Sequence, residues 1–195
     1  LNWRETLPVQ VFGIADAVAI ASGENHTLAV KSDGTVWSWG WNVSGQLGDG
    51  NVAATGFPLP RQVLDLGDVI AVDAGNGHSI ALKSDGTVWA WGLNTSGQLG
   101  DGTTTNSPVP VQVSSLIDIV AISTSQRHNL ALQDDGTVWA WGDNNKGQLG
   151  YAPPGTTDYS ATPVAVAGLS SIVAVAAGGA HSLALTSGGT VYGWG

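Results

Sequence analysis

Four histidines recur at one position of a repeated pattern, and their chemistry is the first to consider. They are His26, His78, His128 and His181. Histidine serves as a general base, a metal ligand or a pH-sensitive switch. A shared metal site would need these side chains to converge. Each repeat unit carries only one histidine, so the four side chains are kept apart, and no unit carries a carboxylate at a matching spacing. We therefore interpret them as structural residues, each hydrogen-bonded to backbone at the edge of its unit, and predict no metal site and no cofactor.

The remaining polar motifs do not indicate catalysis. The pairs Asp33-Gly34, Asp85-Gly86 and Asp135-Gly136 lack the spaced oxygen ligands of a calcium loop, and the fourth copy has Gly188-Gly189 instead. These pairs are typical of tight turns. The sequence contains no phosphate loop, no dinucleotide-binding fingerprint and no nucleophile elbow. We therefore expect no catalytic residues and a protein that is not an enzyme.

Tryptophan is the second recurrent side chain. Each of the first three units carries two tryptophans two positions apart, which places both on one face of a strand. The second of the pair, and its counterpart in the fourth unit, are predicted to be structural wedges between units: Trp39, Trp91, Trp141 and Trp194. A carbohydrate-binding platform is the functional alternative. Trp3 and Trp41 lie outside this position and are better candidates for exposed contacts.

Variation within the repeat indicates where binding specificity would reside. The two residues before each histidine differ between units, and so do the residues before each Gly-Gln-Leu-Gly tetrapeptide. Variable loops on a rigid scaffold are the usual arrangement for binding. The predicted binding residues are Glu24, Asn25, Trp41, Asn76, Gly77, Gln126 and Arg127.

The elements that position these residues follow from the repeat itself. Four units align without a gap, at residues 8–39, 60–91, 110–141 and 163–194, joined by connectors of variable length at 40–59, 92–109 and 142–162. Apolar residues alternate with a period of two, and a hairpin turn separates two short strands in each unit. Four short strands per unit and no helical pattern predict an all-β fold, a β-propeller built from four-stranded blades. Residues 1–195 would form a single repeat domain.

The conserved landmarks of the unit resemble a known family. The string His-x-(Leu/Ile)-Ala-(Leu/Val)-x-x-x-Gly-Thr-Val-(Trp/Tyr)-x-Trp-Gly, followed by Gly-Gln-Leu-Gly, is similar to the repeat of the regulator of chromosome condensation family, in its bacterial type. The resemblance covers nearly the whole chain and implies a propeller that usually closes with seven blades. In a bacterial β-lactamase inhibitor of similar architecture, loops equivalent to those before each histidine hold the enzyme.

Composition narrows the range of partners. The net charge is −9 with only six Lys and Arg residues, and no basic run is present. Nucleic-acid binding depends on basic side chains that neutralise phosphates, so neither nucleic acid nor an anionic membrane is expected as a partner. The chain contains no Cys, which excludes a disulfide framework and thiolate metal sites. This acidic composition without Cys slightly favours an extracellular bacterial location.

The sequence therefore predicts a non-catalytic scaffold that binds a protein partner. Guanine-nucleotide exchange on a small GTPase, as implied by the family's namesake, and a purely structural amplified repeat protein are the alternatives. Four units with three connectors would leave two apolar faces exposed. Two explanations remain open: the chain is part of a larger ring, or two copies associate and close one eight-bladed ring.

Overall fold

The computed structural model describes residues 7–151 and 158–195, which form fifteen β-strands in four antiparallel sheets. Blade 1 contains β1 (Ala17–Ser22), β2 (His26–Lys31), β3 (Val36–Asn42) and β4 (Ala53–Gln62). Blade 2 contains β5 (Val69–Ala74), β6 (His78–Lys83), β7 (Val88–Gly92) and β8 (Ser107–Gln112). Blade 3 contains β9 (Ile119–Thr124), β10 (His128–Gln133), β11 (Val138–Asp143) and β12 (Tyr159–Ala165). Blade 4 contains β13 (Ile172–Ala177), β14 (Ser182–Thr186) and β15 (Val191–Trp194).

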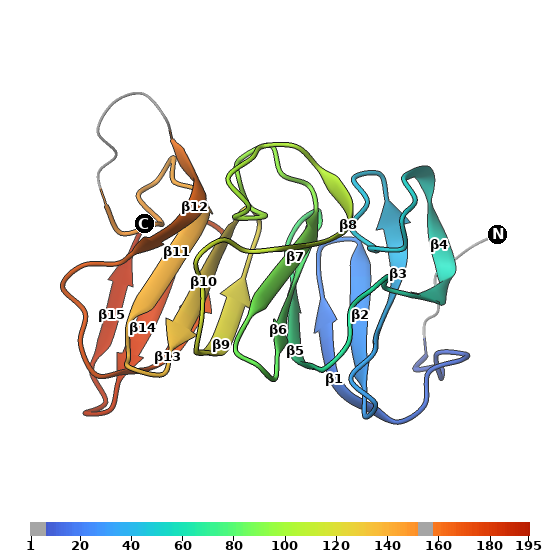
Figure 1. The fold of residues 1–195 in the computed structure, drawn as a ribbon, viewed down its shortest axis with the longest axis horizontal. Coiled ribbons are helices and arrows are strands. Elements are labelled where there is room, and N and C mark those ends of the chain that lie inside the picture. Colours follow the sequence, from blue (N-terminus) through green and yellow to red (C-terminus); the bar gives the residue numbers. More distant parts are fainter. Residues whose placement is uncertain (1–6, 152–157) are drawn as a thin grey trace.

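The strands of each blade pair in sequence order, so each blade is an antiparallel meander (Figure 1). The four blades follow one another along an arc, which confirms the predicted all-β propeller architecture. The blades are one strand out of phase with the sequence units. Pro60, Pro110 and Pro163, which open units in the sequence, lie in the outermost strands of the preceding blades. Among the described residues no helix is long and apolar enough to cross a membrane.

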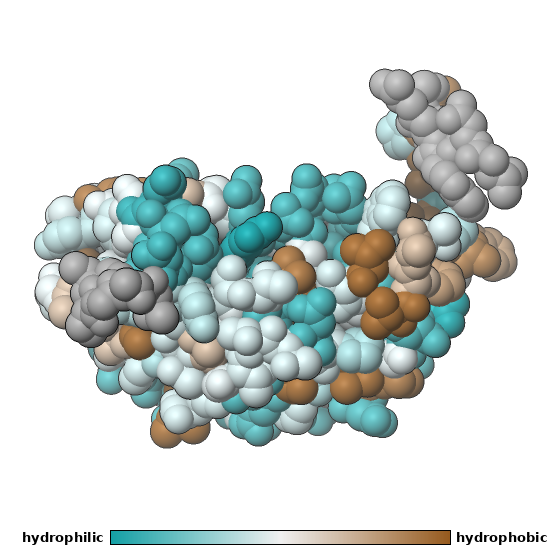
Figure 2. Space-filling model, turned by 90° about the horizontal axis from the view of Figure 1, so that it is seen from above, coloured by the Kyte–Doolittle hydropathy of each residue, from teal (hydrophilic) through white to brown (hydrophobic). Residues whose placement is uncertain are grey.

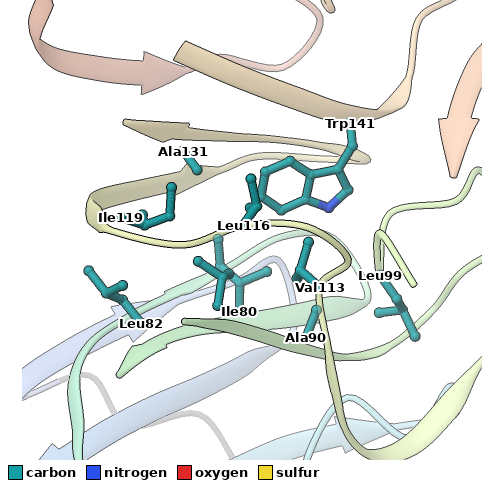
Figure 3. Packing of buried hydrophobic residues seen from close by; sticks show 10 residues of the cluster. Ile80, Leu82, Ala90, Leu99, Val113, Leu116, Ile119, Ala131 and Trp141 are labelled. Carbon is teal, nitrogen blue, oxygen red and sulfur yellow. The ribbon is translucent and has the colours of Figure 1, made fainter. Parts of the chain in front are cut away.

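The hydrophobic core lies in the seams between blades. At the seam between blades 2 and 3, Ile80 and Val113 of blade 2 pack with Trp141 of blade 3, and all three are at most 1% exposed (Figure 3). The same pattern occurs at the other two seams. Period-two alternation explains this arrangement, because one face of each strand points to the next blade and the other face to the previous blade.

Tight hairpin turns join the second and third strands of every blade. The four turn glycines have positive φ, a conformation that costs glycine little: Gly34, Gly86, Gly136 and Gly189. In the first three turns an aspartate precedes this glycine, and its own φ is not positive. It stabilises the turn through its side chain instead. Asp85 Oδ1 accepts hydrogen bonds from the backbone N–H (3.0 Å) and the hydroxyl (2.6 Å) of Thr87, which holds the turn closed.

The innermost strand of each blade begins with a β-bulge. In blades 1, 2 and 4 the pairing register shifts across the second residue of the strand, and in blade 3 the shift falls at the equivalent place. The bulged residues are Val18, Ile70, Val120 and Val173. A bulge changes the direction in which a side chain points. Ile70 is 55% exposed although its neighbour Val69 is 4% exposed.

Candidate binding site on the connector rim

The connector rim is the edge of the arc that carries the loops between first and second strands, together with the long connectors between third and fourth strands. It is the upper edge in Figure 1. The first set of loops, residues 23–25, 75–77 and 125–127, is linked from blade to blade through the backbone. Glu24 N donates to Gly75 O (3.3 Å), and Asn76 N donates to Gln126 O (3.2 Å). Their main chain is therefore held in place while their side chains differ.

These loops surround a shallow hollow of about 370 Å³. Glu24, Asn76 and Gln126 line it, together with Asp73 at the end of β5. The Asp73 carboxylate accepts a hydrogen bond from the backbone N–H of Thr124 in the next blade (2.8 Å). Burial raises the pKa of Asp73, although the backbone hydrogen bonds from Thr124 and Ala74 oppose that shift. The structure thus brings together three of the predicted binding residues, and Asp73 is a wall residue that the repeat pattern did not reveal.

The residues at the junction between each third strand and its connector lie beside the same loops. Trp41 N donates to Asn25 O (2.8 Å), and the equivalent bonds run from Leu93 to Gly77 and from Asp143 to Arg127. The two variable regions of the sequence are therefore neighbours on one surface. Trp41 is 48% exposed, whereas Gly77 is buried and contributes backbone only. Trp3 lies outside the described residues.

The connector rim is not uniform in polarity. Figure 2 looks down on this rim and shows apolar atoms gathered toward the end of the arc formed by blade 1, with polar atoms over its middle. Val43 and Val52, 49% and 61% exposed, belong to the connector of blade 1. The position of Val43 is occupied by Thr95 in blade 2 and Asn145 in blade 3. The scaffold therefore presents an apolar surface in blade 1 and a polar one in blades 2 and 3.

Three of the four repeated histidines, His26, His78 and His128, lie inside the seams, away from this surface. His78 Nε2 is 2.9 Å from Asn129 Oδ1 in the next blade, and Asn129 Nδ2 donates to the backbone carbonyl of Gln98 (2.9 Å). His26 and His128 bond in the same way to Ser79 and Ser182. This differs from the expected backbone bond, because the partner is a side chain of the neighbouring blade.

Burial lowers the pKa of His26, His78 and His128 to about 4 in each case. Protonation would place a charge in a seam where the ring Nδ1 has no hydrogen-bond partner among the described residues. These three histidines are therefore neutral at physiological pH. His181, in blade 4, is exposed.

The polar bridges across the seams were missed by sequence reasoning. Each bridging side chain directly follows the histidine of its own unit, at Ser79, Asn129 and Ser182. The signal was present, since every residue at this position can form hydrogen bonds. The carbonyl of each Gly-Gln-Leu-Gly glutamine also accepts the indole N–H of the next blade's tryptophan, as in Trp141 Nε1 to Gln98 O (3.0 Å).

Neither the rim nor the seams provide a metal site in the described parts of the chain. No group of three or more His, Asp or Glu side chains lies close enough together there to hold a metal ion.

A family model described as the RCC1-like domain matches residues 2–195. The chain belongs to the RCC1-like family. This confirms the predicted resemblance to the regulator of chromosome condensation repeat. Curated relatives of this RCC1-like chain include mouse E3 ubiquitin-protein ligase HERC2, 43% identical over 89 residues (43% of this chain and 2% of that protein). The Drosophila melanogaster regulator of chromosome condensation is 37% identical over 79 residues (40% of this chain and 14% of that protein).

Solved structures of three chains align over nearly the whole of this one. Human WBSCR16 gives a TM-score of 0.83 at 25% identity, covering 92% of this chain and 47% of that one. Saccharomyces cerevisiae Prp20p, studied for its binding to Gsp1p and histones, gives 0.81 at 27% identity, covering 96% and 48%. Yeast RCC1 (Prp20) bound to Kap60 gives 0.82 at 26% identity, covering 96% and 45%. This RCC1-like chain thus spans about half the length of those solved chains, and only a small part of the curated relatives.

Proposed function

We propose that this RCC1-like chain is a non-catalytic scaffold that binds a protein partner through its connector rim. The observation that carries the proposal is the convergence of the variable side chains. Glu24, Asn76 and Gln126 line one hollow. Trp41, near the end of β3, donates its backbone N–H to the carbonyl of Asn25 in the same set of loops. A hydrogen-bonded main chain beneath variable side chains reduces the ordering cost of binding.

The relatives support a protein as the partner. Yeast RCC1 was crystallised with Kap60, and Prp20p was studied with Gsp1p and histones. On this chain, the exposed Trp41 and Arg127 belong to the residue types enriched in interface hot spots. They flank the hollow on blades 1 and 3, so a partner that touches both would cover the loop of blade 2.

Affinity capture from the host extract tests this proposal. The protein and its variant Glu24→Ala, Asn76→Ala, Arg127→Ala are immobilised, and captured proteins are quantified by mass spectrometry. The matched control is Gln10→Ala, Gln62→Ala, Gln112→Ala, which changes three exposed equivalents on the outer side of the units. We expect a captured protein to be lost from the rim variant and retained by the control. Equal capture by both variants would exclude the rim loops as the binding surface.

Guanine-nucleotide exchange on a small GTPase is the alternative function that membership of the family supports. It would use the same protein-binding ability, with the GTPase as partner. A nucleotide-release assay decides between the two functions, because a scaffold leaves the release rate of bound nucleotide unchanged and an exchange factor increases it.

We further propose that two copies associate through the outer faces of blades 1 and 4. Ile20 on blade 1 is 77% exposed, and Leu183, Leu185 and Val191 on blade 4 are 37–61% exposed, although their equivalents at the inner seams are covered. Light scattering should give twice the monomer mass of 19.8 kDa; a monomer at high concentration would exclude this association.

A further inference from the structure

The edge of the arc opposite the connector rim carries an apolar row that no part of the proposed function uses. We call this edge the turn rim; it bears the Asp-Gly hairpin turns and lies along the lower side of Figure 1. The row consists of the four bulged residues, which are 54–65% exposed in every blade: Val18, Ile70, Val120 and Val173. Core packing does not explain them, because the bulge points each side chain away from the seam.

Carboxylates surround this row. Eight exposed aspartates lie in the hairpin turns of the turn rim and in its interblade loops: Asp16, Asp33, Asp65, Asp68, Asp85, Asp118, Asp134 and Asp135. The only basic side chains in these turns among the described residues are Lys31 and Lys83. Their ammonium groups lie 5.6 and 6.0 Å from the centroids of Trp37 and Trp89, over the faces of the indole rings. The turn rim therefore combines apolar surface with strong negative charge.

The two features meet in one hollow at the seam between blades 2 and 3. This hollow has a volume of about 390 Å³ and is lined by Ile70 and Val120, with the carboxylate residues Asp85, Asp118 and Asp134 beside them. Lys83 also lines it, and its ammonium group lies over the Trp89 ring, so three carboxylates face one cation. The backbone ties the parts together, since Asp134 N donates to Asp118 O (3.0 Å) and Ile119 N donates to Gly86 O (3.1 Å). The aliphatic and acidic groups are thus held at a fixed spacing.

The seam between blades 2 and 3 differs from the other two in its charge. Here the following blade contributes two carboxylates, from Asp118 and Asp134. The equivalent positions at the seam between blades 1 and 2 are Asp68 and Ser84, and at the seam between blades 3 and 4 they are Ser171 and Ser187. The repeat therefore concentrates negative charge at one of three otherwise similar positions.

We propose that the turn rim binds a basic polypeptide segment, with an arginine or lysine side chain in the hollow between Ile70 and Val120. Such a side chain has an apolar stem and a cationic end. Its stem would cover the two aliphatic residues, while its cation would meet the carboxylates of Asp118 and Asp134. Aliphatic residues on either side of it in the peptide would cover the rest of the apolar row. Charge complementarity selects this occupant over an acidic or purely apolar segment.

Fluorescence anisotropy with a short labelled peptide of alternating arginine and valine tests the proposal. We expect saturable binding that weakens as salt is added. Asp118→Asn with Asp134→Asn should weaken binding by about tenfold, and Ile70→Thr with Val120→Thr by about threefold. Ser84→Asp should strengthen binding, because it gives the seam between blades 1 and 2 the pair of carboxylates that the seam between blades 2 and 3 already has. Thermal unfolding of each variant verifies that the fold is intact.

Matched controls separate this site from general attraction to an acidic protein. Glu24→Gln with Asp101→Asn removes the same charge from the connector rim, and Val52→Thr with Leu59→Thr removes apolar surface elsewhere; neither should change binding of the peptide. Equal weakening by a control and its turn-rim counterpart would overturn the proposal. So would equal binding of an arginine–serine peptide or of spermine, or no binding at all. The variant Glu24→Ala, Asn76→Ala, Arg127→Ala should bind the peptide normally, so the two proposed surfaces can fail independently.

Discussion

Identical positions of the repeat have different surroundings at the inner seams and on the outer faces of the arc. Trp141 is fully buried at an inner seam, whereas Trp39, its equivalent on the outer face of blade 1, is only partly buried. Leu132 is 3% exposed and its equivalent Leu185 on blade 4 is 37% exposed. A blade therefore does not bury its own apolar faces. The pair of blades is the unit of stability, as in other repeat proteins.

The largest expected effect tests this comparison with tryptophan. Trp141→Ala removes a fully buried indole and its hydrogen bond to Gln98 O, and should reduce the free energy of unfolding by about 3–5 kcal/mol. Trp39→Ala, at the equivalent position on the outer face, should cost less, about 1 kcal/mol, because its indole is only partly buried. Urea denaturation of both variants measures the difference. Similar losses would show that burial by the neighbouring blade is not what stabilises the wedge.

The bridging side chain should give the next largest effect. Asn129→Leu removes the bridge between His78 Nε2 and the Gln98 carbonyl. Because His78 Nε2 keeps Thr124 Oγ1 (2.9 Å) and the Gln98 carbonyl keeps the Trp141 indole N–H (3.0 Å), the loss should be about 1–1.5 kcal/mol. Asn129→Ser should cost less, because serine bridges the same groups at the other two seams. The control is Thr27→Val on the outer face of blade 1, with an expected change below about 0.5 kcal/mol. If serine and leucine are equally destabilising, the bridge does not act through hydrogen bonding.

The free energy of unfolding should change little with pH near neutrality and should decrease as the solution becomes more acidic. Burial lowers the pKa of His26, His78 and His128 from 6.5 to about 4, so between these values the unfolded chain binds protons that the folded chain excludes. Stability should therefore fall as the pH decreases from about 6.5 to about 4. Chemical denaturation at a series of pH values measures this slope, and His78→Gln should reduce it by about a third.

Asp73 contributes with the opposite sign. Burial raises its pKa, so the stability that it provides when protonated is lost as the pH rises through that value. Asp73→Asn should therefore make the free energy of unfolding depend more steeply on pH between about 4 and about 6.5. A slope that is unchanged in His78→Gln would contradict the assignment of the pH dependence to the buried histidines.

Local sequence patterns were sufficient to predict the strands, the turns and the order of the blades. The alternation in Thr87–Trp91 fixes which side chains share a face, and the Gly86 position requires the positive φ that the turn has. The bulge at Ile70 was not predictable, because an apolar residue in an apolar run gives no sign that it points to solvent. The same holds for Asp73, whose environment depends on Thr124 in the next blade.

By itself, the sequence determined that four units of one kind would form similar blades and that variation would gather in two loops per unit. Spacing within a unit is enough for this, since strand pairing and hairpin turns are local interactions. Only the tertiary structure decided that the two loops are neighbours on one rim, that the histidines bond to the next blade, and that carboxylates and bulged aliphatic residues share the opposite rim. These contacts join residues about fifty positions apart, so they depend on how one blade packs against another, which the pattern within a unit does not encode.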